Sequence, residues 1–131
     1  MEEIVLSISS GNGPEECAHA AAFTMQAMVK EINELARSGT DIAAAVEETE
    51  ESRVAGNIRS GLLRVTGKGA AGFAESWTGS IQWVWRSAYR PHHKRNNWFV
   101  SVKPYYELEW GKAIRVYDGD SLQLLRRRNY E

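Results

Sequence analysis

The chain has 131 residues, of which 43% are hydrophobic and 25% are charged, and its formal net charge is −1. This length supports one hydrophobic core and is too short for two domains of ordinary size, so we expect one globular domain. The single cysteine, Cys17, excludes an internal disulfide and a cysteine-based zinc site, and the acidic start and lack of long apolar runs favour a cytoplasmic protein with no membrane partner.

The first part of the chain predicts a strand followed by a long helix. EIVLSIS at residues 3–9 alternates as a strand does, and SGNG interrupts it. PEE at residues 14–16 suits the first turn of a helix, and apolar residues then recur at threes and fours until Gly39. Residues 41–52 are ambiguous, because their alanines and glutamates favour a helix while their position suits a returning strand.

The remaining elements predict an α+β fold. Further strands are expected at 58–67, 80–87 and 97–102, a short helix at 70–77, and a C-terminal β-hairpin around Asp118-Gly119. The order β-α-β-β-α-β plus one more strand is typical of a two-layer sandwich of split β-α-β type with a mixed or antiparallel sheet. We expect one domain over residues 1–103, with 104–131 as an extension of it. The expected contacts between helix and sheet join Met25, Met28, Ile32 and Leu35 to Leu6, Val65 and Trp83.

Acidic and basic residues are unevenly distributed along the chain. Residues 1–51 carry eleven acidic and two basic side chains, whereas residues 52–131 carry six acidic and fourteen basic ones. No acidic residue occurs between Trp77 and Tyr106. The centre of that stretch, RSAYRPHHKRNNWFV at 86–100, begins in the connection between two predicted strands, where a scaffold can present binding residues. We interpret it as a basic face for polyanions, which the acidic half of the chain keeps apart from the rest of the molecule. The alternative is a bipolar surface that only favours solubility.

The residue types in this stretch point to RNA. Guanidinium and ammonium groups contact phosphates, asparagine recognises base edges, and aromatic rings stack on unpaired bases. We therefore predict an RNA-binding site and no small-molecule substrate, with Tyr89 and Trp98 as stacking candidates and the tryptophans at 83 and 85 as core or interface residues. The predicted RNA-binding residues are Arg86, Tyr89, Arg90, His92, His93, Lys94, Arg95, Asn96, Asn97 and Trp98.

Two other motifs have weaker functional interpretations. SGNGPEE lacks the lysine and hydroxyl residue of a P-loop, and its two glutamates would repel a phosphate. His92 and His93 could act as ligands or as general acid and base, which leaves a small metal-free nuclease as one alternative, but no nearby carboxylate orients either ring. We expect no catalytic residue, no metal and no cofactor.

LSISSGNGPEEC at 6–17 and GSIQWVWRSAYRPHHKRNNWFV at 79–100 resemble bacterial class I peptide chain release factors, above all the release factor H branch associated with RNA-repair genes. The resemblance implies a strand at 41–47 and a translation protein whose partner is the ribosome or ribosomal RNA, with a damaged decoding centre as the target in that branch. In codon-reading members a tripeptide in this loop recognises the stop codon. The matching residues here are Ser87-Ala88-Tyr89, which adds Ser87 to the predicted site, although Ala88 replaces the family's usual proline.

Release factors hydrolyse peptidyl-tRNA with a Gly-Gly-Gln loop, and these 131 residues contain no Gly-Gly-Gln. We therefore expect this chain alone not to be an enzyme, and to be a recognition portion that is truncated, split from a catalytic half, or repurposed. The alternative is an interaction module that docks a separate Gly-Gly-Gln chain or an RNA-repair enzyme.

Overall fold

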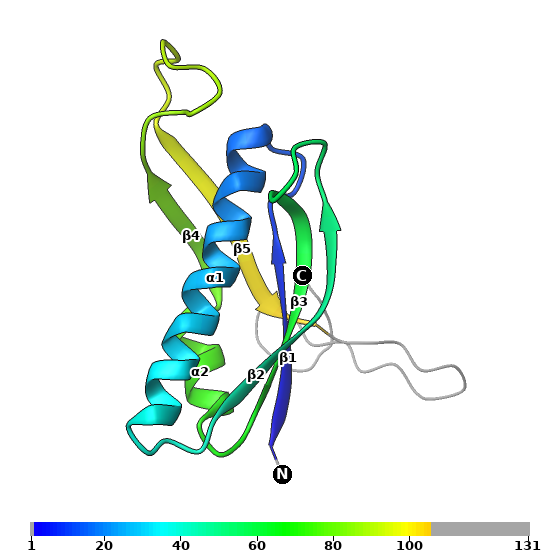
Figure 1. Ribbon diagram of the computed structural model, residues 1–131, viewed down its shortest axis with the longest axis vertical. Coiled ribbons are helices and arrows are strands. Elements are labelled where there is room, and N and C mark those ends of the chain that lie inside the picture. The colour runs from blue at the N-terminus through cyan, green and yellow to red at the C-terminus, as the bar shows by residue number, and fades with distance from the viewer. Residues whose placement is uncertain (1, 106–131) are drawn as a thin grey trace, which may run out of the picture.

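The computed structural model describes residues 2–105 as a five-stranded sheet with two helices on one of its faces (Figure 1). This confirms the predicted α+β sandwich, while the predicted hairpin around Asp118 lies outside the described residues. The helices are α1 (Glu15–Arg37) and α2 (Ala70–Trp77), and the strands are β1 (Glu3–Ser9), β2 (Ala43–Glu51), β3 (Ile58–Thr66), β4 (Gly79–Val84) and β5 (Asn97–Pro104).

The sheet is open and antiparallel, with the strand order β2-β3-β1-β5-β4. Strands β1 and β2 each pair with β3 between them, so they run parallel to one another and form a split β-α-β unit with α1. Strands β2 and β4 are the two edges of the sheet. Neither helix described between residues 2 and 105 is long and apolar enough to cross a bilayer.

One hydrophobic core fills the space between the sheet and the helices. The apolar stripe of α1 meets the inward-facing residues of the strands, as the helical and alternating patterns predict. Leu35 and Trp83, which were expected in the core, are only half-buried at its margin, and Cys17 is buried as expected. The large apolar side chains with less than 2% exposure are Leu6, Ile8, Met28, Ile32, Leu63, Val65, Trp98, Val100 and Val102.

Strand β2 resolves the ambiguity of residues 41–52. It pairs with β3 from Ala43 to Glu51, with register shifts near Val46 and near its end. Most of its side chains are exposed, so its glutamates remain solvated at the sheet edge. Backbone pairing with β3 therefore outweighs the helix propensity of these residues. The strand that the family resemblance implies is confirmed, although it begins two residues later than expected and extends four residues further.

Candidate nucleic-acid interface

The basic stretch forms an exposed connection between β4 and β5. Residues 85–96 project beyond the end of the sandwich, near the amino-terminal end of α1 (Figure 1). The backbone N–H of Trp85 donates to the carbonyl oxygen of Asn96 at 3.1 Å and closes the base of the loop. Strand β4 ends at Val84, so the predicted strand at 80–87 is three residues too long and its last residues belong to the loop.

The buried carboxylate of Glu16 fastens this loop to the first turn of α1. Nε and Nη2 of Arg90 donate to its two oxygens at 2.7 and 2.8 Å, and Oγ of Ser87 donates to Oε2 at 2.5 Å. Glu16 is only 1% exposed. Burial by itself would raise the pKa of this carboxyl, but the hydrogen bonds from Arg90 and Ser87 outweigh it and lower the pKa from 4.5 to about 2. This forked, charge-assisted contact holds the guanidinium in one position and neutralises its charge.

Ser87 also shapes the local turn. Its Oγ accepts hydrogen bonds from the backbone N–H groups of Tyr89 at 3.0 Å and Arg90 at 2.9 Å. A serine side chain that binds the backbone two and three residues ahead stabilises a tight turn. The hydroxyl thus has three partners when the Glu16 carboxylate is counted, and residues 87–90 form one well-defined turn.

Tyr89 provides a second attachment through the turn between β2 and β3. The Nδ2 group of Asn57 donates to Oη of Tyr89 and to Oε2 of Glu15, both at 2.7 Å. Nδ1 of His19 lies 3.2 Å from Oδ1 of Asn57 and 3.4 Å from Oη of Tyr89. Asn57 is buried, so this chain of hydrogen bonds joins the loop to α1 through the interior of the protein.

Glu15 anchors that second attachment. Burial would raise the pKa of its carboxyl, but hydrogen bonds from Ser52 and Asn57 and the charges of Arg59 and Arg53 lower it below its ordinary value. The two glutamates of the first helical turn therefore each hold a different element. The sequence predicts both glutamates in the first turn because the positive end of the helix dipole favours carboxylates, and this remains compatible with these contacts.

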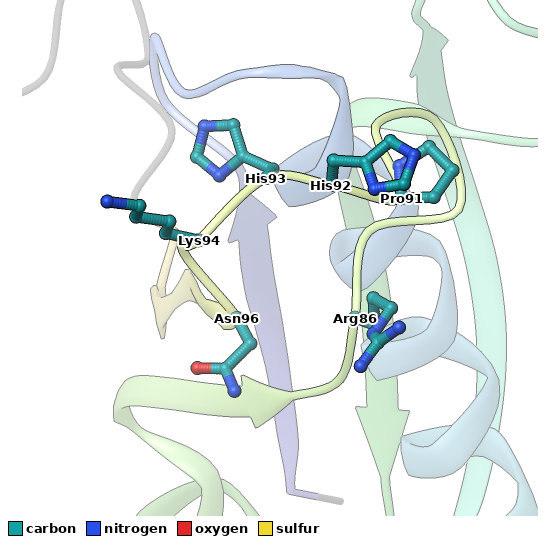
Figure 2. Close-up of a pocket in the computed structure, with 6 residues that line it drawn as sticks. All are labelled: Arg86, Pro91, His92, His93, Lys94 and Asn96. Carbon is teal, nitrogen blue, oxygen red and sulfur yellow. The ribbon is translucent and has the colours of Figure 1, made fainter.

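The loop surrounds a small electropositive hollow of about 260 Å³, which is lined by residues from its base and from its tip (Figure 2). No carboxylate lines it. Arg95 turns away from the hollow, because its Nε donates to the carbonyl oxygen of Asn97 at 2.7 Å and its guanidinium lies 4.8 Å from the ring centre of Trp98. The lining residues are Arg86, Pro91, His92, His93, Lys94 and Asn96.

Most of the predicted site residues are exposed, but three require correction. Trp98 is fully buried under the loop, so its ring has no face to offer a base, and the stacking prediction for it is wrong. Ser87 is buried and already bonded to Glu16, and Arg90 is engaged by the same carboxylate. The exposed members of the predicted site are Arg86, Tyr89, Arg90, His92, His93, Lys94, Arg95, Asn96 and Asn97.

The sequence predicts that the acidic and basic halves of the chain stay separate, and this prediction is wrong. Glu16 belongs to the acidic half and binds Arg90, which is 74 residues away in the chain. Sequence reasoning also missed Asn57 and His19, which hold Tyr89. A pattern of nearby residues could not reveal pairs so distant in sequence.

The histidines of the loop form no metal centre in the structure described here. Between residues 2 and 105, no group of three or more His, Cys, Asp and Glu side chains could hold a metal ion. Nδ1 of His93 accepts a hydrogen bond from the backbone N–H of Arg95 at 3.0 Å. His93 therefore contributes to the shape of the loop tip.

Comparison with known proteins finds a similarity to a release factor homolog. No family model matches the chain. Over 114 residues, which are 86% of this chain, it is 40% identical to a peptide chain release factor homolog of Escherichia coli. The chain is thus similar to a release factor homolog over most of its own length. It spans about half of that relative, because the aligned part covers 53% of it. The resemblance deduced from the two sequence blocks is thereby confirmed for the release-factor-like family.

Proposed function

We propose that this domain is the ribosome-binding, RNA-contacting part of a release-factor-like translation protein of the release factor H type, and that the loop at 85–96 makes the contact. The observation that carries the proposal is an acid-free loop with exposed cations, on a chain 40% identical to a release factor homolog. Basic side chains in an otherwise acid-free region attract the phosphate backbone and raise the rate of association.

The attachments of the loop support this proposal. Because Glu16 neutralises Arg90, the contacts to phosphate fall to Arg86 and Lys94, which line the hollow within the loop, and to Arg95 beside it. The contacts to α1 and to Asn57 hold the loop in one conformation before RNA arrives. A preorganised loop loses less conformational entropy on binding than a mobile one does.

We propose that the catalytic group for peptide release lies outside these 131 residues. These 131 residues contain no Gly-Gly-Gln, so we propose that hydrolysis of peptidyl-tRNA requires a further segment or a separate chain. The second candidate function is a docking module for such a chain or for an RNA-repair enzyme. Its support is the edge position of β4, because an edge strand leaves one side of its backbone available for pairing.

Sedimentation with purified small ribosomal subunits tests the main proposal. The wild-type chain is expected to co-sediment, and the double variant Arg86→Ala/Lys94→Ala is expected to stay in solution. A matched variant, Lys30→Ala/Lys68→Ala, loses the same charge at exposed positions outside the loop and should co-sediment like wild type. Equal binding by all three proteins would contradict a role for the loop and favour the docking module.

A further inference from the structure

Five aromatic rings form a continuous cluster beside the basic loop. They come from the first three turns of α1, from β4 and from the start of the loop, and are His19, Phe23, Trp83, Trp85 and Tyr89. The ring centres of His19 and Phe23 are 4.5 Å apart, those of Phe23 and Trp85 are 5.7 Å apart, and those of Trp83 and Trp85 are 5.1 Å apart. The His19 ring also meets Tyr89 edge to face at 5.9 Å.

This aromatic cluster reaches the surface. Phe23 is 41% exposed and Tyr89 is 39% exposed, whereas Trp98 below them is fully buried. The polar atoms of two members are directed inward, since Nε1 of Trp83 donates to Oγ1 of Thr24 at 2.8 Å and Oη of Tyr89 is bonded to Asn57. The outermost ring, Phe23, has no polar atom at all. The cluster therefore presents hydrophobic ring surface to solvent.

The cluster is also rigid and continuous with the cations. Trp85 lies against Phe23 and directly precedes Arg86, so the exposed ring surface adjoins the electropositive hollow within the loop. Edge-to-face and tilted ring contacts, together with the hydrogen bonds of Trp83 and Tyr89, hold the rings in place. A hydrophobic ring surface that adjoins positive charge is complementary to a nucleotide, which has a flat base beside a phosphate.

We propose that the aromatic cluster binds an unpaired base of single-stranded RNA by stacking, with Phe23 as the principal contact, while the loop cations hold the neighbouring phosphates. This inference rests on the proposed RNA-binding function and names its ligand as an unpaired nucleotide segment. Since Phe23 has no hydrogen-bonding group, it accepts any base that offers a flat face. The positive charge beside the cluster favours this ligand over an apolar protein segment.

The chain itself offers a matched control for Phe23. Phe99 on β5 is 48% exposed, yet it faces away from the helices, because its neighbours Trp98 and Val100 point into the core. Replacing either phenylalanine with alanine removes a similar exposed ring. Alanine is the best helix former, so Phe23→Ala preserves α1, which circular dichroism can verify.

The test compares two RNA probes by fluorescence anisotropy. One is an unpaired oligouridylate of about ten nucleotides, and the other has the same phosphates but abasic sugars in its central part. Wild type is expected to bind the base-bearing probe at least about fivefold more tightly. Phe23→Ala should abolish this preference without changing the affinity for the abasic probe, whereas Phe99→Ala and Phe23→Trp should retain it.

The possible failures are distinguishable. If wild type binds both probes equally, or if Phe23→Ala weakens both probes to the same degree, the stacking inference is wrong while RNA binding by the loop stands. If wild type binds neither probe nor the small ribosomal subunit, the proposed function fails with it. A preference that survives in Phe23→Ala but disappears in Phe99→Ala would assign base binding to the opposite face of the sheet.

Discussion

Glu16 is the residue on which the position of the loop depends. Its carboxylate is buried at the start of α1, and all its strong partners come from the loop, namely the guanidinium of Arg90 and the hydroxyl of Ser87. A buried carboxylate without these partners would be costly to keep ionised. The contact therefore couples the folding of the helix terminus to the ordering of the loop.

This coupling predicts an acid-dependent stability. The pKa of Glu16 is about 2 in the folded protein against an ordinary 4.5, so its contribution is complete above about pH 4.5 and is lost as the pH falls towards 2. Since Arg90 is half-exposed and partly screened by water, we expect Glu16→Gln to lower the free energy of unfolding at pH 7 by on the order of 2 kcal/mol. Urea titrations between pH 7 and 2 should show the difference from wild type shrinking at low pH.

The exposed Glu51 provides the control for that experiment. Glu51→Gln should leave the free energy of unfolding within about 0.5 kcal/mol of wild type, because surface substitutions away from buried contacts have small effects. A Glu16→Gln protein with wild-type stability at pH 7 would show that the contact does not hold the loop.

At the scale of elements, α1 supplies one side of the core. Ile32 is fully buried and Leu35 is half-buried one turn further on. The two side chains are similar in size, so the costs of truncating them differ mainly through burial. Truncation of a buried Ile or Leu costs about 2 to 5 kcal/mol, and we expect Ile32→Ala to lower the melting temperature by about 6 °C or more. Leu35→Ala should lower it less. Melting curves in which Leu35→Ala is the more damaging change would contradict the assigned helix face.

The loop has its own prediction, which concerns its contacts with phosphate. Each phosphate contact changes the slope of log affinity against log salt by about −0.7 to −0.9. With Arg90 held by Glu16, we expect two or three contacts and a slope of roughly −1.4 to −2.7 for a ribosomal RNA fragment. Lys94→Ala should make the slope shallower by about one unit. Salt titrations that give the same slope for wild type and Lys94→Ala would exclude a phosphate contact at this residue.

The elements were more predictable than the contacts between them. Periodicity identified both helices and four of the five strands, because each pattern depends on residues close in sequence. Residues 43–51 resisted local reasoning, since pairing with β3 decides their conformation. Trp98 could have been assigned correctly, because its alternation with Val100 and Val102 places it on the core face. The contact of Glu16 with Arg90 had no local signal.

For the whole molecule, the relation to release factors and the lack of Gly-Gly-Gln make a joint prediction. The chain should bind ribosomes without hydrolysing the ester of peptidyl-tRNA, because it carries the proposed binding residues and lacks Gly-Gly-Gln in these 131 residues. Ribosomes that hold labelled peptidyl-tRNA should retain the label after addition of the chain, with or without a stop codon. Release above the control without protein would show that another group in these 131 residues is catalytic.

The measurement that tests the central claim most directly is a site-specific crosslink from the loop to the ribosome. Because Cys17 is buried, a cysteine introduced by His92→Cys can be labelled selectively with a photoreactive aryl azide, and Lys68→Cys provides an exposed position outside the loop. We predict that light attaches the protein labelled at position 92 to 16S ribosomal RNA, and that the protein labelled at 68 gives no more than background. Crosslinks from position 92 to protein alone, or equal RNA crosslinking from both positions, would contradict the loop as the RNA contact.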